Sequence, residues 1–173
     1  EGAVGDWSAL YLFEDKGILI EEAVMGVMLF NGTMCIGRLL GNRLGKHLTS
    51  KQVVVGGYLL GSIAMGLIVF LPGHASMYTY LLLGISLAMI VPNLFSAMGE
   101  QNVIPMTQAV ATSTMLGYMG ILMGPALIGF IAHGTSLTVA FIVLTTLLVV
   151  SAGIGKYAYH LMSKDCGLSE EQI

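Results

Sequence analysis

Long apolar runs dominate this sequence and constrain its fold more than any other feature. A short apolar segment covers 1–13, and five longer runs follow it at about 22–42, 53–71, 77–98, 107–132 and 136–155. Each longer run would reach about 30 Å or more as an α-helix, which matches the hydrocarbon thickness of a bilayer, whereas the first segment would reach only about 20 Å. We therefore predict an all-α membrane protein with one partial and five complete transmembrane helices.

The composition agrees with this fold class and excludes several functions. Hydrophobic residues make up 55% of the 173 residues and charged residues only 10%, whereas a soluble domain carries about a quarter charged residues. The net charge of −3 provides no basic surface, which excludes a nucleic-acid partner. Cys35 and Cys166 are interpreted as free thiols, and the cysteines and histidines show no paired spacing, so we expect no metal site and no cofactor.

The positive charges predict how the chain crosses the membrane. Positively charged residues near the ends of spans are retained on the cytoplasmic side. If the spans alternate in direction, most of these residues fall on one side, namely Arg43, Lys46, Lys51, Lys156 and Lys164. We therefore expect the turn at 43–52 and the polar tail at 156–173 to be cytoplasmic, and the loops at 14–20, 72–76 and 133–135 to lie outside.

Glycines spaced four residues apart occur in three of the runs. Such spacing places them on one face of a helix, where another helix can approach closely. Pro92 and Pro125 lie inside apolar runs and are expected to bend their helices. The residues predicted to serve helix packing are Gly37, Gly41, Gly57, Gly61, Gly120, Gly124 and Pro125.

Two acidic residues, Glu1 and Asp6, belong to the first apolar segment. Acidic groups at membrane depth are expensive and commonly functional, so they are candidates for proton coupling or for binding a polar substrate. The alternative is that they lie at the interface or pair with a basic residue of a part of the protein that precedes this chain.

Uncharged polar and aromatic side chains supply the other substrate candidates. Trp7 can stack on a sugar ring or belong to the interfacial aromatic belt. Asn31 and Asn93, near the centres of their runs, can line a cavity or form interhelical hydrogen bonds. Tyr118 can line a pathway or pack in the core.

The stretch 37–47 carries a resemblance to a known family. Asn42-Arg43-Leu44-Gly45-Lys46-His47 is similar to the cytoplasmic-loop signature of the major facilitator superfamily, Gly-x-x-x-Asp-Arg-x-Gly-Arg-Lys. This sequence departs from the signature because Asn42 replaces the acidic residue and Arg38 stands in the place of the leading glycine. The segment Gly120-Ile121-Leu122-Met123-Gly124-Pro125 resembles the Gly-x-x-x-Gly-Pro helix motif of the same superfamily. The resemblance implies that a cytoplasmic gate contains Arg38, Asn42, Arg43, Gly45 and Lys46.

The order of the spans resembles the second six-helix half of such a transporter. The resemblance implies alternating access around a central site, with an N-terminal six-helix half as the missing partner. The segment 1–9 also looks like bacterial inner-membrane facilitators of undefined substrate, some of them near the sugar permeases. The implied function is secondary transport of a small solute, with or without a proton, across the inner membrane, and a sugar permease and a drug exporter both stay open.

Two other classes of protein are alternatives to a transporter. A membrane enzyme would need a nucleophile with its base, a metal site or paired carboxylates at membrane depth, and the sequence offers none of these. A membrane scaffold or receptor that transports nothing is the remaining alternative.

The missing carboxylate at Asn42 leads to a prediction about the gate. Asn42 is expected to lie near the start of the 107–132 helix, whose first backbone N–H groups lack partners. A carboxylate there would gain about 0.3–1 kcal/mol from the helix dipole, and an amide less. We therefore expect Asn42→Asp in the full-length protein to favour the state closed to the cytoplasm. Labelling of cytoplasmic-side cysteines should decrease, and unchanged labelling would contradict the hypothesis.

Overall fold

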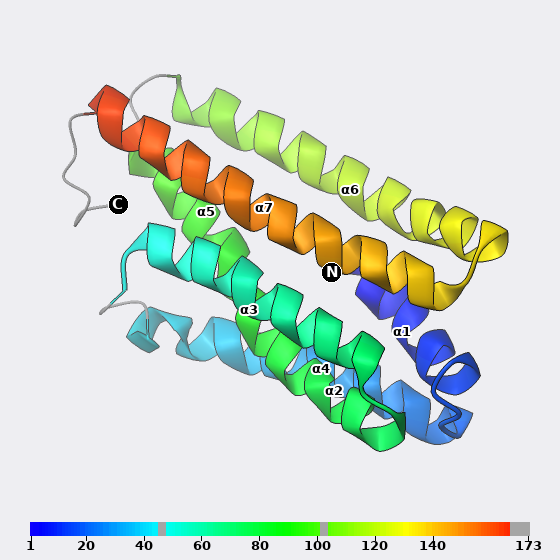
Figure 1. Ribbon diagram of the computed structural model, residues 1–173. Coiled ribbons are helices and arrows are strands. Elements are labelled where there is room, and N and C mark those ends of the chain that lie inside the picture. The colour runs from blue at the N-terminus through cyan, green and yellow to red at the C-terminus, as the bar shows by residue number, and fades with distance from the viewer. Residues whose placement is uncertain (45–47, 101–103, 167–173) are drawn as a thin grey trace.

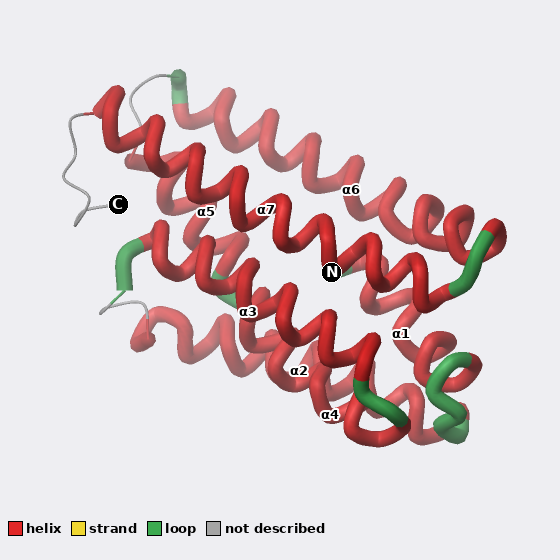
Figure 2. The backbone as a smooth tube through the Cα atoms, viewed as in Figure 1, coloured by secondary structure: helices red, strands yellow, loops and turns green. Residues whose placement is uncertain are grey.

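The protein is all-helical. A computed structural model describes residues 1–44, 48–100 and 104–166, and these contain no strand (Figures 1 and 2). Its helices are α1 (Gly2–Glu14), α2 (Ile20–Leu44), α3 (Ser50–Phe70), α4 (Gly73–Leu87), α5 (Ile90–Glu100), α6 (Met106–Gly134) and α7 (Leu137–Cys166). The all-α prediction is therefore confirmed.

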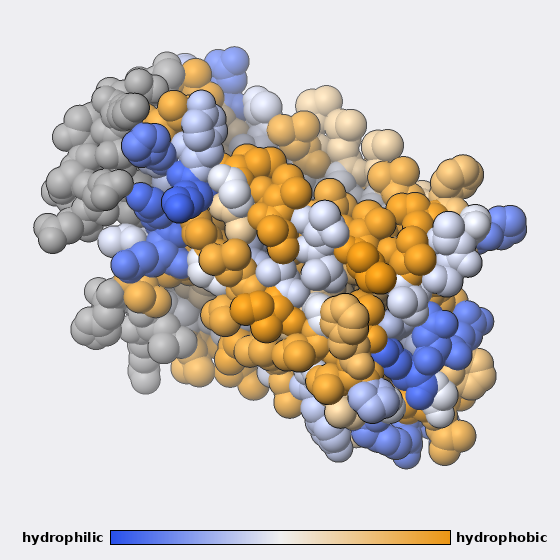
Figure 3. Space-filling view, in the orientation of Figure 1, coloured by the Kyte–Doolittle hydropathy of each residue, from blue (hydrophilic) through white to orange (hydrophobic). Residues whose placement is uncertain are grey.

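Five segments of the described chain are long and apolar enough to cross a membrane. They correspond to α2, α3, α4 with α5, α6 and α7, whereas α1 has only 13 residues. The space-filling view shows apolar residues over the middle of the visible face and hydrophilic residues toward its two ends (Figure 3). This distribution is that of an integral membrane protein.

The long helices lie roughly antiparallel, so their ends gather at two ends of the molecule (Figure 1). We call one the Lys16 end, where α1, α3 and α6 finish and α2, α4 and α7 begin. We call the other the Thr49 end, where α3 and α6 begin and α2, α5 and α7 finish. The alternating directions are those expected of consecutive spans.

The core lies mainly among α1, α2, α3, α4 and α7. Helix α3 packs against α4 and α7, α2 packs against α1 and α4, and α6 contacts α1 and α7. The largest fully buried side chains are Tyr11, Phe30, Tyr80 and Phe141. Helix α6 differs from the others because its buried residues are only Ala109 and Ile128. A long apolar helix therefore leaves most of its surface uncovered by the described part of the chain.

Several glycines lie where helices meet. A Cβ atom added at Gly57 would lie 2.7 Å from the Ser86 carbonyl oxygen, and one at Gly61 would lie 2.9 Å from Leu87. Gly37 faces Ala88 and Gly41 faces Met89. At Gly120 and Gly124 no such contact occurs within 4 Å among the described residues. The packing role of these last two glycines stays a prediction.

The expected 77–98 run is two helices joined by a turn at residues 88–89. We expected a bend at Pro92, and the break lies before it. Proline has no N–H to donate to the carbonyl four residues earlier, and that carbonyl belongs to Ala88. The proline therefore acts one turn upstream of its own position.

Three helix boundaries differ from those expected. Helix α3 begins at Ser50 because Thr49 and Gln52 form a capping box, in which Thr49 accepts from the Gln52 N–H and Gln52 accepts from the Thr49 N–H. The turn expected at 72–76 is wrong, since α4 begins at Gly73 and the Ser76 hydroxyl donates to the Ile68 carbonyl at 2.7 Å. Helix α7 continues to Cys166, past the expected end of its span at 155.

Candidate functional site

An ion pair joins the start of α1 to α2. The Arg38 Nη2 atom lies 3.1 and 3.3 Å from the two carboxylate oxygens of Glu1. The two side chains are 45% and 40% exposed in the described chain. The structure thus gives Glu1 a basic partner within this chain, whereas one alternative from the sequence placed such a partner in a part of the protein that precedes the chain.

Glu1 also lines a pocket of about 560 Å³, which we call the central pocket. Its other polar side chains are Tyr58 of α3 and Ser151 of α7, and apolar residues such as Ile90 and Leu147 form most of its wall. The α6 wall consists of Gly117, Gly120 and Gly124 together with Ile121. Because these glycines have no side chains, space stays open beside the α6 backbone.

The central pocket combines one carboxylate with an apolar lining. Such a pocket suits a small, largely apolar solute with one polar group, which is the common pattern of ligand sites. The Arg38 guanidinium lies against the Glu1 carboxylate, so the two opposite charges compensate each other. Because Glu1 belongs to both, the pocket and the ion pair share one carboxylate.

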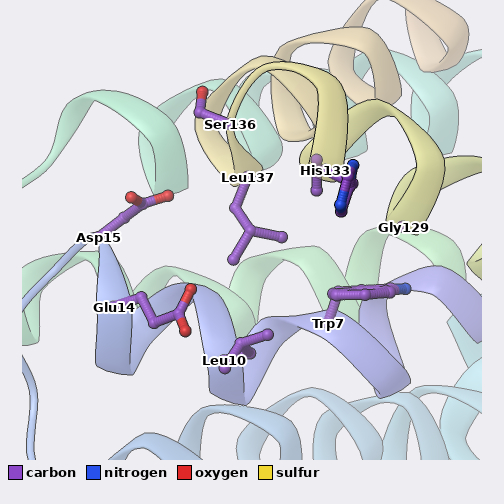
Figure 4. A pocket seen from close by; sticks show the side chains of 9 residues that line it. Trp7, Leu10, Glu14, Asp15, Gly129, His133, Ser136 and Leu137 are labelled. Atoms are coloured by element: carbon purple, nitrogen blue, oxygen red, sulfur yellow. The ribbon is translucent and has the colours of Figure 1, made fainter.

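Trp7 links α1 to α6 through a hydrogen bond and a close packing contact. Its indole N–H donates to the Pro125 carbonyl oxygen at 3.0 Å. A Cβ atom added at Gly129 would lie 2.7 Å from the Trp7 ring, so the glycine makes room for the indole. Trp7 also lines a second pocket of about 490 Å³ at the Lys16 end, which we call the end pocket (Figure 4). Asp6, in contrast, is exposed and lines neither pocket.

The other predicted substrate residues are not gathered in one place. The side-chain amides of Asn31 and Asn93 donate to the carbonyl four residues earlier in their own helices, those of Val27 and Met89. Neither asparagine forms an interhelical hydrogen bond among the described residues, nor does either line the two pockets. Tyr118 is 63% exposed, so it does not pack in the described core.

The predicted gate is described only in part. Arg38 pairs with Glu1, as above. Gly45 and Lys46 lie outside the described residues, as do the side chains of Asn42 and Arg43. The gate and the contact expected for Asn42 stay predictions.

Comparison with curated proteins shows what the chain is related to. It is 41% identical over 155 residues, 88% of its length, to an uncharacterised MFS-type transporter of Yersinia pestis. The resemblance to the major facilitator superfamily is confirmed. The chain is also 29% identical over 157 residues to the membrane protein MosC of Rhizobium meliloti, and 27% identical over 147 residues to an uncharacterised transporter of Sinorhizobium fredii. These two matches cover 89% and 83% of the chain.

The matches extend over only part of these transporters. The chain spans 40% of the Yersinia protein, 39% of MosC and 38% of the Sinorhizobium protein. No family model matches the chain. No solved structure matches it significantly. The relatives are transporters or membrane proteins by name and none is named as an enzyme, so a transport function in general is supported.

Sequence reasoning missed one important cation, Lys16. Its Nζ atom donates to the Val69 and Leu71 carbonyls at 2.6 and 2.9 Å, at the end of α3. The same atom lies 5.3 Å from the centroid of the Tyr11 ring, which stacks on Phe141. Burial lowers the pKa of Lys16, and the neighbouring Asp15 opposes that shift. Only the fold brings the α1–α2 loop to the end of α3, which is why the sequence carried no signal.

We expect Lys16→Met to lower the free energy of unfolding by about 1–3 kcal/mol, because two carbonyls at the end of α3 lose a charged donor. Thermal unfolding in detergent, followed by circular dichroism, measures the change. Lys156→Met removes the same charge from an exposed position and is the matched control. Equal destabilisation by both substitutions would show that the hydrogen bonds of Lys16 to the end of α3 do not stabilise the protein.

Proposed function

We propose that this chain is the C-terminal half of a secondary transporter that moves a small solute by alternating access. The observation that carries the proposal is the 41% identity with an MFS-type transporter over 88% of the chain. The coverage of only about 40% of that relative, together with five spans, fits a half that works with a partner half. Alternating access in such proteins requires both halves, with the site between them.

The uncovered faces of α2 and α6 support a partner half beside them. Helix α2 exposes Asn31 and Arg38, and polar groups are expensive against lipid tails. Helix α6 exposes most of its surface, including Gly117 and Gly120. Glycines allow another helix to approach closely, but they bury little apolar surface when they face lipid. We infer that the partner half covers parts of both helices and leaves the central pocket between the halves.

Glu1 is the best supported candidate for proton coupling. It lines the central pocket and its charge is balanced by Arg38, so binding of a proton would break the pair. Asp6 lacks both properties, because it lines neither pocket and has no ion-pair partner among the described residues. We propose Glu1, Arg38, Tyr58 and Ser151 as the residues that meet the solute or the proton.

Transport is tested with the full-length protein in proteoliposomes. Counterflow with a panel of sugars, amphiphilic drugs and small organic solutes should reveal at least one that exchanges, and an imposed proton gradient tests the coupling. Glu1→Gln should abolish the effect of the gradient while counterflow continues, and Asp6→Asn is the matched control. No exchange of any solute would favour the scaffold or receptor.

We also propose that the protein lies in the inner membrane of a bacterium and that its Thr49 end faces the cytoplasm. The support is the positive charge near that end, from Lys51 and Lys156 among others. A green fluorescent protein fused after Ile173 should fluoresce, whereas alkaline phosphatase at the same place should be inactive. The reverse pattern would overturn this orientation.

A further inference from the structure

The end pocket lies apart from the central pocket and has different chemistry. It is enclosed by the end of α1, the end of α6 and the start of α7. Figure 4 shows Leu10 and Glu14 rising from α1, Leu137 descending from α7 and the His133 side chain directed toward the Trp7 ring. The volume of about 490 Å³ is enough for a small organic molecule.

The charge of the end pocket is negative. The carboxylate of Glu14 has no hydrogen-bond or ion-pair partner among the described residues, and that of Asp15 accepts only from the Thr138 hydroxyl, at 3.2 Å. Lys16 follows directly, but its ammonium is engaged with the carbonyls at the end of α3. His133 is the basic side chain among the lining residues.

The helix ends reinforce this charge. Helices α1 and α6 both finish at the pocket, and the carbonyl end of a helix carries a partial negative charge. Helix α7 begins there with the opposite sign, and the Ser136 hydroxyl accepts from the Val139 N–H at 3.2 Å. Two carboxylates and two carbonyl ends thus face one histidine and one capped amino end.

Trp7 supplies an aromatic surface beside this charge. Its hydrogen bond to Pro125 and its contact with Gly129 hold the ring in one orientation. Glu14 lies seven residues after Trp7 and therefore on the same face of α1. Tryptophan is the aromatic side chain that best attracts a cation over its ring.

We propose that the end pocket binds a small organic cation, an ammonium group with short apolar substituents. The ammonium lies between the Trp7 ring and the Glu14 carboxylate, and the substituents contact Leu10 and Leu137. This binding does not depend on the proposed transport function, because the end pocket and the central pocket share no lining residue.

The test uses the 173-residue chain in dodecyl maltoside micelles, which contain no ammonium headgroup. Trp7 is the chain's one tryptophan, so its emission reports on the end pocket. Titration with tetramethylammonium chloride, at constant ionic strength kept with sodium chloride, should change the emission until it saturates. The uncharged molecule of similar size, tert-butanol, should not reproduce the change.

Two matched variants examine the role of charge. Glu14→Gln should raise the tetramethylammonium concentration at half-saturation about threefold to fivefold. Asp6→Asn removes the same charge from an exposed position of α1 outside the pocket and should leave it unchanged. Broadening of the tetramethylammonium proton resonance by the protein gives a second measurement of binding. This measurement also applies to Trp7→Leu, which has no tryptophan emission. In that variant the broadening should disappear, while circular dichroism shows that the helices are intact.

Three results would overturn the proposal. One is the absence of any saturable change in emission and of resonance broadening. Another is an equal response to tert-butanol, which would show that the pocket accepts any small apolar molecule whatever its charge. The third is an equal effect of Asp6→Asn and Glu14→Gln, which would show a general effect of surface charge. Loss of solute counterflow in the full-length transporter bears on the proposed function and not on this site.

Discussion

Replacing Gly84 with alanine is expected to lower the free energy of unfolding by about 3 kcal/mol, because α2 and α4 touch at this position. A Cβ atom added at Gly84 would collide with the Thr33 hydroxyl and with the carbonyl oxygen of Phe30. The second of these is backbone, which cannot rotate away as a side chain can. Overpacking of this kind typically costs about 1–3 kcal/mol, and a backbone collision belongs at the upper end. Unfolding in a mixed micelle titrated with dodecyl sulfate measures the change.

The control for Gly84 is another helical glycine with free space around it. A Cβ atom added at Gly153 in α7 meets nothing within 4 Å. Gly153→Ala should therefore keep or raise the stability, since alanine favours the helix by about 0.5–1 kcal/mol. Similar stability of Gly84→Ala and Gly153→Ala would show that the two helices do not meet as described.

Replacing Arg38 with methionine is the second substitution with a large expected effect. It leaves the Glu1 carboxylate beside the central pocket without its cation. An unpaired charge at membrane depth costs about 2.5–3.5 kcal/mol, and the partial exposure of this pair reduces the expected loss of stability to about 2 kcal/mol. In the full-length protein the proposed transport should also fall, because Arg38 is one of the residues that we propose to meet the solute or the proton.

A double-mutant cycle separates the ion pair from the other roles of Arg38. Glu1→Gln combined with Arg38→Met should recover much of the stability that Arg38→Met alone loses, because no charge is left unpaired. Asp6→Asn combined with Arg38→Met is the matched control and should recover nothing. If the two double variants are equally stable, Arg38 does not act through Glu1.

The local pattern of this sequence was enough to predict its class and most of its helices. Apolar runs of about 20 residues admit few structures in a bilayer, because every backbone polar group needs a partner within the segment. The start of α3 is also encoded locally, because Thr49 and Gln52 form a recognisable capping box. The break before Pro92 follows from the missing N–H of proline, once the carbonyl four residues earlier is considered.

The candidate sites depended much more on the fold. Glu1 and Arg38 are 37 positions apart, and Trp7 and Pro125 are 118 apart. No periodicity links such residues, so sequence reasoning missed Tyr58, Ser151 and the hydrogen bonds of Lys16. It also considered interhelical hydrogen bonds for Asn31 and Asn93, whose side-chain amides instead donate to carbonyls of their own helices. A polar side chain in a span shows that a partner is needed but does not show which one.

The sequence by itself determined that this protein crosses a membrane as helices and that it resembles a known superfamily of transporters. Both conclusions rest on local properties, the length of apolar runs and short motifs in their connections. The tertiary structure alone decided which charges pair, where α2 and α4 touch at Gly84, and which residues enclose the two pockets. These depend on contacts between distant segments, and such contacts are set by the packing of whole helices and not by any one stretch of the chain.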